Sequence, residues 1–192
     1  MAGSVILAAG LSMLAAAPAQ AQAHDKAWWQ AVAKAEYAVP AGAPLPALLD
    51  ELTAMLGSSD AELRDDIAYS TLLQWIYVKR IVPVPARLRL AAEWQRRMRD
   101  GVPGPEGPGV LGRSFSALAL AVLVGLDNEA PYLDHAAYAG VFDAALRYLR
   151  DERDVRGFAP SLGWMHSVAH TADLSHLACA RTLLLERLRL FM

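Results

Sequence analysis

The sequence has little cysteine and little net charge. Cys179 is the only cysteine among the 192 residues, so no disulfide can form within the chain. A lone thiol in an apolar helical segment is typical of a small core residue. The formal net charge is −2 and the pI is about 6.2, which gives no electrostatic reason to expect nucleic-acid binding.

Strand-like patterns are also scarce. Runs of β-branched residues are few, and no segment alternates apolar and polar residues over more than a few positions. Alanine and leucine are abundant. Hydrophobic residues make up 55% of the chain and charged residues 20%, which is enough for one packed core. We therefore expect an all-α fold.

One long apolar run lies at the start of the chain. Residues 4–17 carry no charge and are followed by PAQAQA, which contains two overlapping small-x-small cleavage sites. The run is shorter than the roughly 20 residues that span a bilayer. The pattern predicts a signal peptide over residues 1–23, cleaved after Ala23 or Ala21. The product would be periplasmic or secreted, with no stable membrane anchor.

After a lead-in segment over residues 24–44, the pattern predicts a helical domain over residues 45–180. Its helices fall into pairs, and the second helices begin near residues 60, 113 and 163. This spacing of about 50 residues is close to the period of HEAT repeats. We expect a HEAT-like α-solenoid of about three helical hairpins. The helices are expected over Leu45–Leu56, Asp60–Lys79, Ala86–Arg99, Ser114–Leu126 and Asp134–Arg150, and from Gly163 onward.

The helix expected over Ser114–Leu126 is nearly all apolar and follows a loop rich in glycine and proline. It is too short for a membrane span and is expected to form the centre of the core. Ser114 is a plausible N-cap, and Arg113 could pair with an acid on a neighbouring helix. Asp65 and Asp66 are expected in a first helical turn, where the helix dipole favours carboxylates.

Two histidines and an aspartate provide the candidate site. His166, His170 and Asp173 fall within about 60° of one another on a helix, so their side chains could converge. Imidazoles spaced i, i+4 with a carboxylate one turn on could bind a divalent metal. The residue after His166 is Ser167, so the glutamate base of the HExxH motif is missing. The alternative is a structural network in which His170 and Asp173 form a hydrogen bond.

Three ordered motifs resemble one uncharacterised family. They are RDDIAYSTLLQWI at 64–76, GRSFSALALAVL at 112–123 and DERDVRGFAPSLGWMHSVAHTAD at 151–173. Together they resemble bacterial domain-of-unknown-function family 2785 over most of residues 45–177. The resemblance implies a HEAT-like helical fold and carries no established biochemical role. Family members usually continue through further helices, so the RTLLLERLRLFM ending suggests a chain truncated at its C-terminus.

Residues 181–192 form an atypical tail rich in leucine and arginine. Without a further helix pair to cover it, the tail would either cap the last hairpin or drive self-association. Two classes of function remain. One is a scaffold that binds a protein or peptide on a solenoid surface. The other is a metal-dependent or acid–base enzyme centred on His166, His170 and Asp173, with Asp65 or Asp66 brought close by helix stacking.

Overall fold

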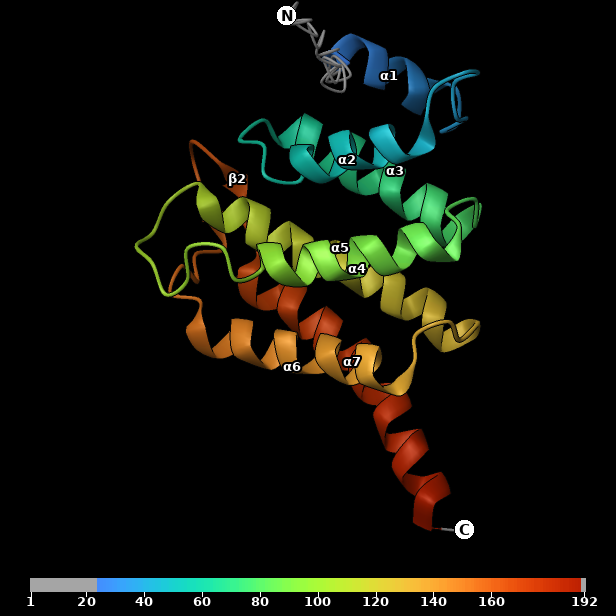
Figure 1. The fold of residues 1–192 in the computed structure, drawn as a ribbon. Coiled ribbons are helices and arrows are strands. Elements are labelled where there is room, and N and C mark those ends of the chain that lie inside the picture. The colour runs from blue at the N-terminus through green and yellow to red at the C-terminus, as the bar shows by residue number, and fades with distance from the viewer. Residues whose placement is uncertain (1–23, 191–192) are drawn as a thin grey trace, which may run out of the picture.

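The computed structural model describes residues 24–190, and these are mainly helical (Figure 1). One two-stranded hairpin interrupts the helices of the described chain. The elements in order are α1 Lys26–Lys34, α2 Leu45–Met55, η1 Glu62–Tyr69, α3 Ser70–Leu73, η2 Gln74–Val78, α4 Val84–Arg97, α5 Gly109–Glu129, α6 His135–Asp151, β1 Phe158–Ala159, β2 Gly163–Trp164 and α7 Ser167–Leu190.

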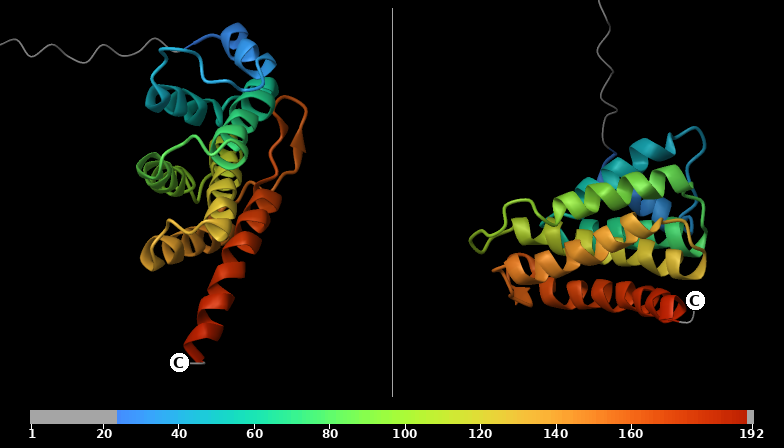
Figure 2. Two further views of the ribbon diagram at one scale, coloured as in Figure 1. Left: turned by 90° about the vertical axis from the view of Figure 1, so that its right-hand side faces the viewer. Right: turned by 60° about the horizontal axis from the view of Figure 1, so that its bottom comes forward.

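The helices stack in two layers. In the left view of Figure 2, α2, α4 and α6 lie on one side, and the helix containing α3, α5 and α7 lie on the other. α5 packs along α7 and against α4, and α6 packs against α7. The largely helical fold that the sequence predicts is therefore confirmed, and the consecutive helices α4 and α5, and α6 and α7, pack against each other.

Carboxylates cap several helices, two of them, Asp60 and Asp134, at predicted helix starts. Asp134 accepts a hydrogen bond from the backbone N–H of Ala137 at 2.7 Å, and Asp25 accepts one from Trp28 at 2.8 Å. Asp60 accepts the backbone N–H groups of Glu62 and Leu63. Asp60 thus satisfies two of the free donors at the start of this helix, and Asp65 lies in its first turn, as expected.

Residues 62–78 form one continuous helical segment whose two outer parts, η1 and η2, are wider than an α-helix. At the end of η1 the backbone N–H of Ser70 bonds to the carbonyl of Asp65, five residues earlier. Such π-type turns are rare and occur frequently at functional sites. The sequence predicts a helix here and does not reveal its widened turns.

The apolar core helix α5 is longer than the sequence suggests. It begins at Gly109, immediately after Pro108, whereas the prediction begins at Ser114. Gly112 lies against Gly57, at which a Cβ would stand 3.5 Å from the Gly112 Cα, so the two glycines allow close backbone packing. Ser114 is consequently inside the helix and is not its N-cap. α5 is apolar and long enough to cross a membrane, but 78% of that apolar stretch is buried among the other helices, as is usual for a core helix.

A buried ion pair joins α5 to the end of α6. Arg113 donates to Glu152 through Nε at 2.6 Å and Nη2 at 3.1 Å, and both side chains are buried. This confirms the expected pairing of Arg113 with an acid. The buried Asp154 accepts the backbone N–H of Gly107 at 3.1 Å and Nε of Arg156 at 2.7 Å. These bonds fix the glycine-rich loop and the segment after α6 at the same end of the stack.

The start of the last helix differs from the prediction. Gly163 and Trp164 pair with Phe158 and Ala159 in an antiparallel hairpin, and α7 begins only at Ser167. Gly163 and His166 both have positive φ, +74° and +51°, which a continuous helix excludes. The prediction of a helix from Gly163 and of a fold without strands is therefore wrong at this point.

At the C-terminal end, the backbone of α7 continues to Leu190, through most of the predicted tail. The structure gives no side-chain detail beyond Cys179, so capping and self-association of residues 181–192 stay predictions. The predicted signal peptide, residues 1–23, lies outside the described residues.

Candidate functional site

The three motifs that the sequence singles out meet at one end of the helical stack. η1 contributes Arg64 and Asp65, the start of α5 contributes Ser114 and Phe115, and the hairpin with the first turn of α7 contributes the segment 163–170. The Arg64 side chain there contacts the backbone of Trp164, 100 residues further along the sequence.

Arg64 connects the segments that meet at this end. Its side chain is fully buried, and its Nε and Nη2 donate bidentate hydrogen bonds to the Asp65 carboxylate at 2.8 and 3.3 Å. The remaining bonds are to backbone carbonyls: Ser58 at 2.9 Å, Leu162 at 3.3 Å and Trp164 at 3.3 Å. A guanidinium has five N–H donors, and here each has an acceptor. A buried charge is tolerated only when it is satisfied in this way.

The Phe115 ring packs between Arg64 and His170. The Arg64 guanidinium carbon lies 4.9 Å from the centre of the ring, within range of a cation–π interaction. The His170 ring meets Phe115 edge to face at 4.8 Å. η1 and α7 are thereby linked through one aromatic side chain of α5.

His170 is buried and bonded through a single ring nitrogen. Its Nδ1 lies 2.9 Å from Oγ of Ser114, and that hydroxyl donates its proton to the carbonyl of Met165. The hydroxyl must therefore accept from Nδ1–H, which assigns the imidazole its Nδ1-protonated tautomer. Burial, followed by the neighbouring His166 and Arg64, lowers the pKa of His170 to about 4. The imidazole is neutral at pH 7, and the Ser114 proton is engaged with a carbonyl, which makes Ser114 a poor nucleophile.

The exposed part of the site is an aromatic ledge formed by Phe158, Trp164 and His166. The imidazole of His166 stacks on the Trp164 indole with ring centres 4.8 Å apart and planes 4° apart. Phe158 meets Trp164 edge to face at 5.1 Å. Phe158 is 51% exposed and Trp164 54% exposed. The ledge is thus a preformed aromatic surface open to solvent.

Asp65 adds a carboxylate near the ledge. Burial raises the pKa of Asp65, while the charges of Arg64 and His166 act in the opposite direction. Its side chain is 37% exposed, so one edge of the carboxyl group is open to solvent. The participation of Asp65 in a site with His166 and His170, which the sequence suggests, stays a prediction.

The structure brings together two of the three predicted site residues. The rings of His166 and His170 are 5.5 Å apart between centres. Asp173 is exposed and lines a separate apolar groove beside Tyr69, whose pKa is raised by burial and by that carboxylate. The hydrogen bond expected between His170 and Asp173 is replaced by the bond to Ser114. Within residues 24–190, no group of three or more His, Cys, Asp or Glu side chains is placed to hold a metal ion.

Sequence reasoning missed Arg64 and Trp164 as members of the site. Both stand inside the motifs, next to Asp65 and within the segment that contains His166. No local periodicity indicates that Arg64 is buried, because its acceptors come from the hairpin about 100 residues away. The sequence predicts helix at β2, which conceals the position of Trp164.

The buried neutral state of His170 predicts a pH dependence of stability. The pKa of His170 falls from about 6.5 in the unfolded chain to about 4 in the folded protein. Its contribution to the free energy of unfolding is therefore complete above pH 6.5 and is lost as the pH falls toward 4. Urea unfolding of the wild type should show a loss of up to about 3 kcal/mol from this group across that window. His170→Gln should lack this part of the slope, whereas His176→Gln, an exposed position on the same helix, should retain it. Equal slopes for wild type and His170→Gln would contradict the assignment.

Comparison with known proteins finds a family that part of the chain resembles. Neither a search of curated proteins nor a search of solved structures found a match. A family model matches residues 101–191, the region that contains α5, α6, the hairpin and α7. This region is similar to the family described as protein of unknown function (DUF2785).

Proposed function

We propose that the chain is a HEAT-like α-solenoid that serves as a protein- or peptide-binding scaffold. The support for the fold is the alternation of helices between two layers, as in a stack of helical hairpins (Figure 2). The apolar run and AQAQA site at the start of the chain support export, with the mature protein in the periplasm or outside the cell.

The observation that carries the binding role is the aromatic ledge. Half-exposed Trp164 and Phe158 leave apolar surface in water, and such surface often marks an interaction site. Trp is among the residues that contribute most to protein–protein binding, and a rigid aromatic loses little entropy on binding. The buried Arg64 fixes the hairpin through the carbonyls of Leu162 and Trp164, so the ledge keeps its form before a partner arrives.

This role predicts that Trp164→Ala reduces binding. Peptides selected from a random display library on the wild-type protein should bind Trp164→Ala about 30-fold more weakly, since a central aromatic contributes about 2 kcal/mol or more. Leu149→Ala is the matched control, because Leu149 is 50% exposed on α6 and lies outside the ledge. Both variants should melt near the wild-type temperature. Selected peptides that bind wild type and Trp164→Ala equally would remove the ledge as the binding surface.

A second candidate is a metal-dependent or acid–base enzyme centred on His166, His170 and Asp173. The contact between His166 and His170 favours it, and the Nδ1–H donation of His170 leaves its Nε2 unprotonated. Asp173 would have to approach from its present position beside Tyr69.

Metal analysis separates the two candidates. The scaffold role predicts that purified protein carries no stoichiometric zinc, iron or manganese, and that chelator leaves the melting temperature of wild type and His170→Gln unchanged. About one equivalent of metal, with a chelator-induced fall in melting temperature in the wild type alone, would contradict the scaffold role and support the metal site.

A further inference from the structure

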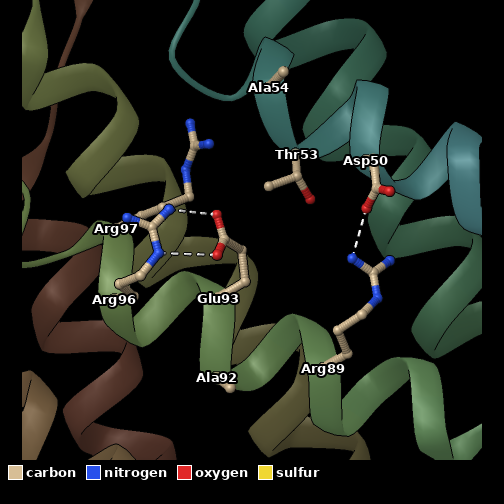
Figure 3. Close-up of a pocket in the computed structure, with 8 residues that line it drawn as sticks. All are labelled: Asp50, Thr53, Ala54, Arg89, Ala92, Glu93, Arg96 and Arg97. Atoms are coloured by element: carbon tan, nitrogen blue, oxygen red, sulfur yellow. Dashed lines mark hydrogen bonds and ion pairs between the residues drawn. The ribbon is translucent and has the colours of Figure 1, made fainter. Parts of the chain in front are cut away.

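A polar groove lies between α2 and α4, on elements that do not contribute to the aromatic ledge (Figure 3). It has a volume of about 570 Å³. Ala54 and Ala92 are small lining residues and leave room between the two helices. The full lining consists of Asp50, Thr53, Ala54, Arg89, Ala92, Glu93, Arg96 and Arg97.

Ion pairs within the groove use four of its five charged side chains. Arg89 bonds to Asp50 at 2.6 Å, and Arg96 bonds to Glu93 at 2.8 Å. The Arg97 side chain makes no hydrogen bond or ion pair with the described residues, and its Nε is buried without a partner. Figure 3 shows the Arg97 guanidinium directed away from Glu93 and toward the end of α2. The groove therefore contains one unpaired cation and carries one net positive charge.

The backbone around Arg97 confines its guanidinium. A Cβ built on Gly57 or on Gly112 would lie 3.6 Å from Nη2 of Arg97, so the group fits against two glycines. This contact limits the rotamers that the side chain can adopt. A cation held in place loses less entropy when it binds than a freely moving surface arginine does.

Thr53 offers a second donor to the groove. Its side chain is buried, and its hydroxyl oxygen accepts the indole N–H of Trp94 at 3.3 Å. The hydroxyl proton remains available, since no acceptor for it occurs among residues 24–190. Figure 3 shows Thr53 between Arg97 and Arg89, with its hydroxyl oxygen on the side of Arg89. A peptide that extends along the groove from Arg97 toward Arg89 would therefore meet the hydroxyl.

We propose that this groove binds a carboxylate group of an acidic peptide, with Arg97 as the anchoring cation and Thr53 as a second hydrogen-bond donor. A guanidinium presents parallel N–H donors that match a carboxylate. Glu93 keeps its negative charge, because the hydrogen bond from Arg96 holds its pKa below the ordinary value although burial raises it. That fixed charge beside the anchor disfavours a doubly charged phosphate and favours a singly charged group.

The site is separate from the aromatic ledge and does not depend on the role proposed for it. Trp164 lies on β2, and the groove is formed by α2 and α4. A Trp164→Ala variant should therefore bind an acidic probe as the wild type does. This variant therefore distinguishes a failure of binding at the ledge from a failure of binding at the groove.

The test uses fluorescein-labelled hexaglutamate and fluorescence anisotropy at low salt, with labelled hexaglutamine as the uncharged probe. The wild type should bind hexaglutamate, and Arg97→Gln should bind it about tenfold more weakly or worse. Arg99→Gln is the matched control. Arg99 is exposed just beyond the same end of α4, and its substitution removes the same charge outside the groove. Thr53→Val should weaken binding by a smaller factor.

Three results would overturn the proposal. One is equal affinity of hexaglutamate for wild type and Arg97→Gln, and another is no binding to wild type at millimolar protein. The third is displacement of the probe by inorganic phosphate at lower concentration than by acetate, which would make the groove a phosphate site. Circular dichroism melting of each variant identifies any loss of affinity that comes from unfolding.

Discussion

The buried guanidinium of Arg64 is the interaction on which this end of the molecule depends. Removal of a charged group from water is costly, and the cost is offset here by five hydrogen bonds to Asp65 and to the carbonyls of Ser58, Leu162 and Trp164. The three carbonyls belong to the turn before η1 and to the hairpin, and the Arg64 side chain also packs on Phe115 of α5. One side chain therefore joins three separate parts of the chain.

The hairpin needs this external support. Each of its strands is only two residues long, and His166 adopts a positive φ that non-glycine residues seldom take. Arg64 holds two of its carbonyls, and Ser114 holds the carbonyl of Met165. Because these bonds fix its backbone, the hairpin can expose Phe158 and Trp164 to solvent and keep them in place. The buried polar contacts and the exposed aromatic side chains thus belong to one arrangement.

The sequence predicts the helices well, because their apolar periodicity and their capping residues are local. Asp134 caps α6, and Leu45 begins α2, as expected. The site is less predictable. The sequence indicates the segment and the two histidines, but places His166 on a helix that begins one residue later and pairs His170 with Asp173 instead of Ser114. The reason is physical: glycine and positive φ break the helix, and the partners of buried polar groups come from residues distant in the sequence.

Hydrogen exchange of the hairpin amides tests the central claim most directly. The Met165 N–H bonds to the carbonyl of Gly157 at 2.8 Å, so its protection reports whether the hairpin is formed. In Arg64→Met, which keeps similar bulk but has no donors, protection of Met165 should fall far more than protection of the α5 core, and Arg64→Lys should give an intermediate loss. A folded Arg64→Met protein whose hairpin amides exchange as slowly as those of the wild type would contradict the account.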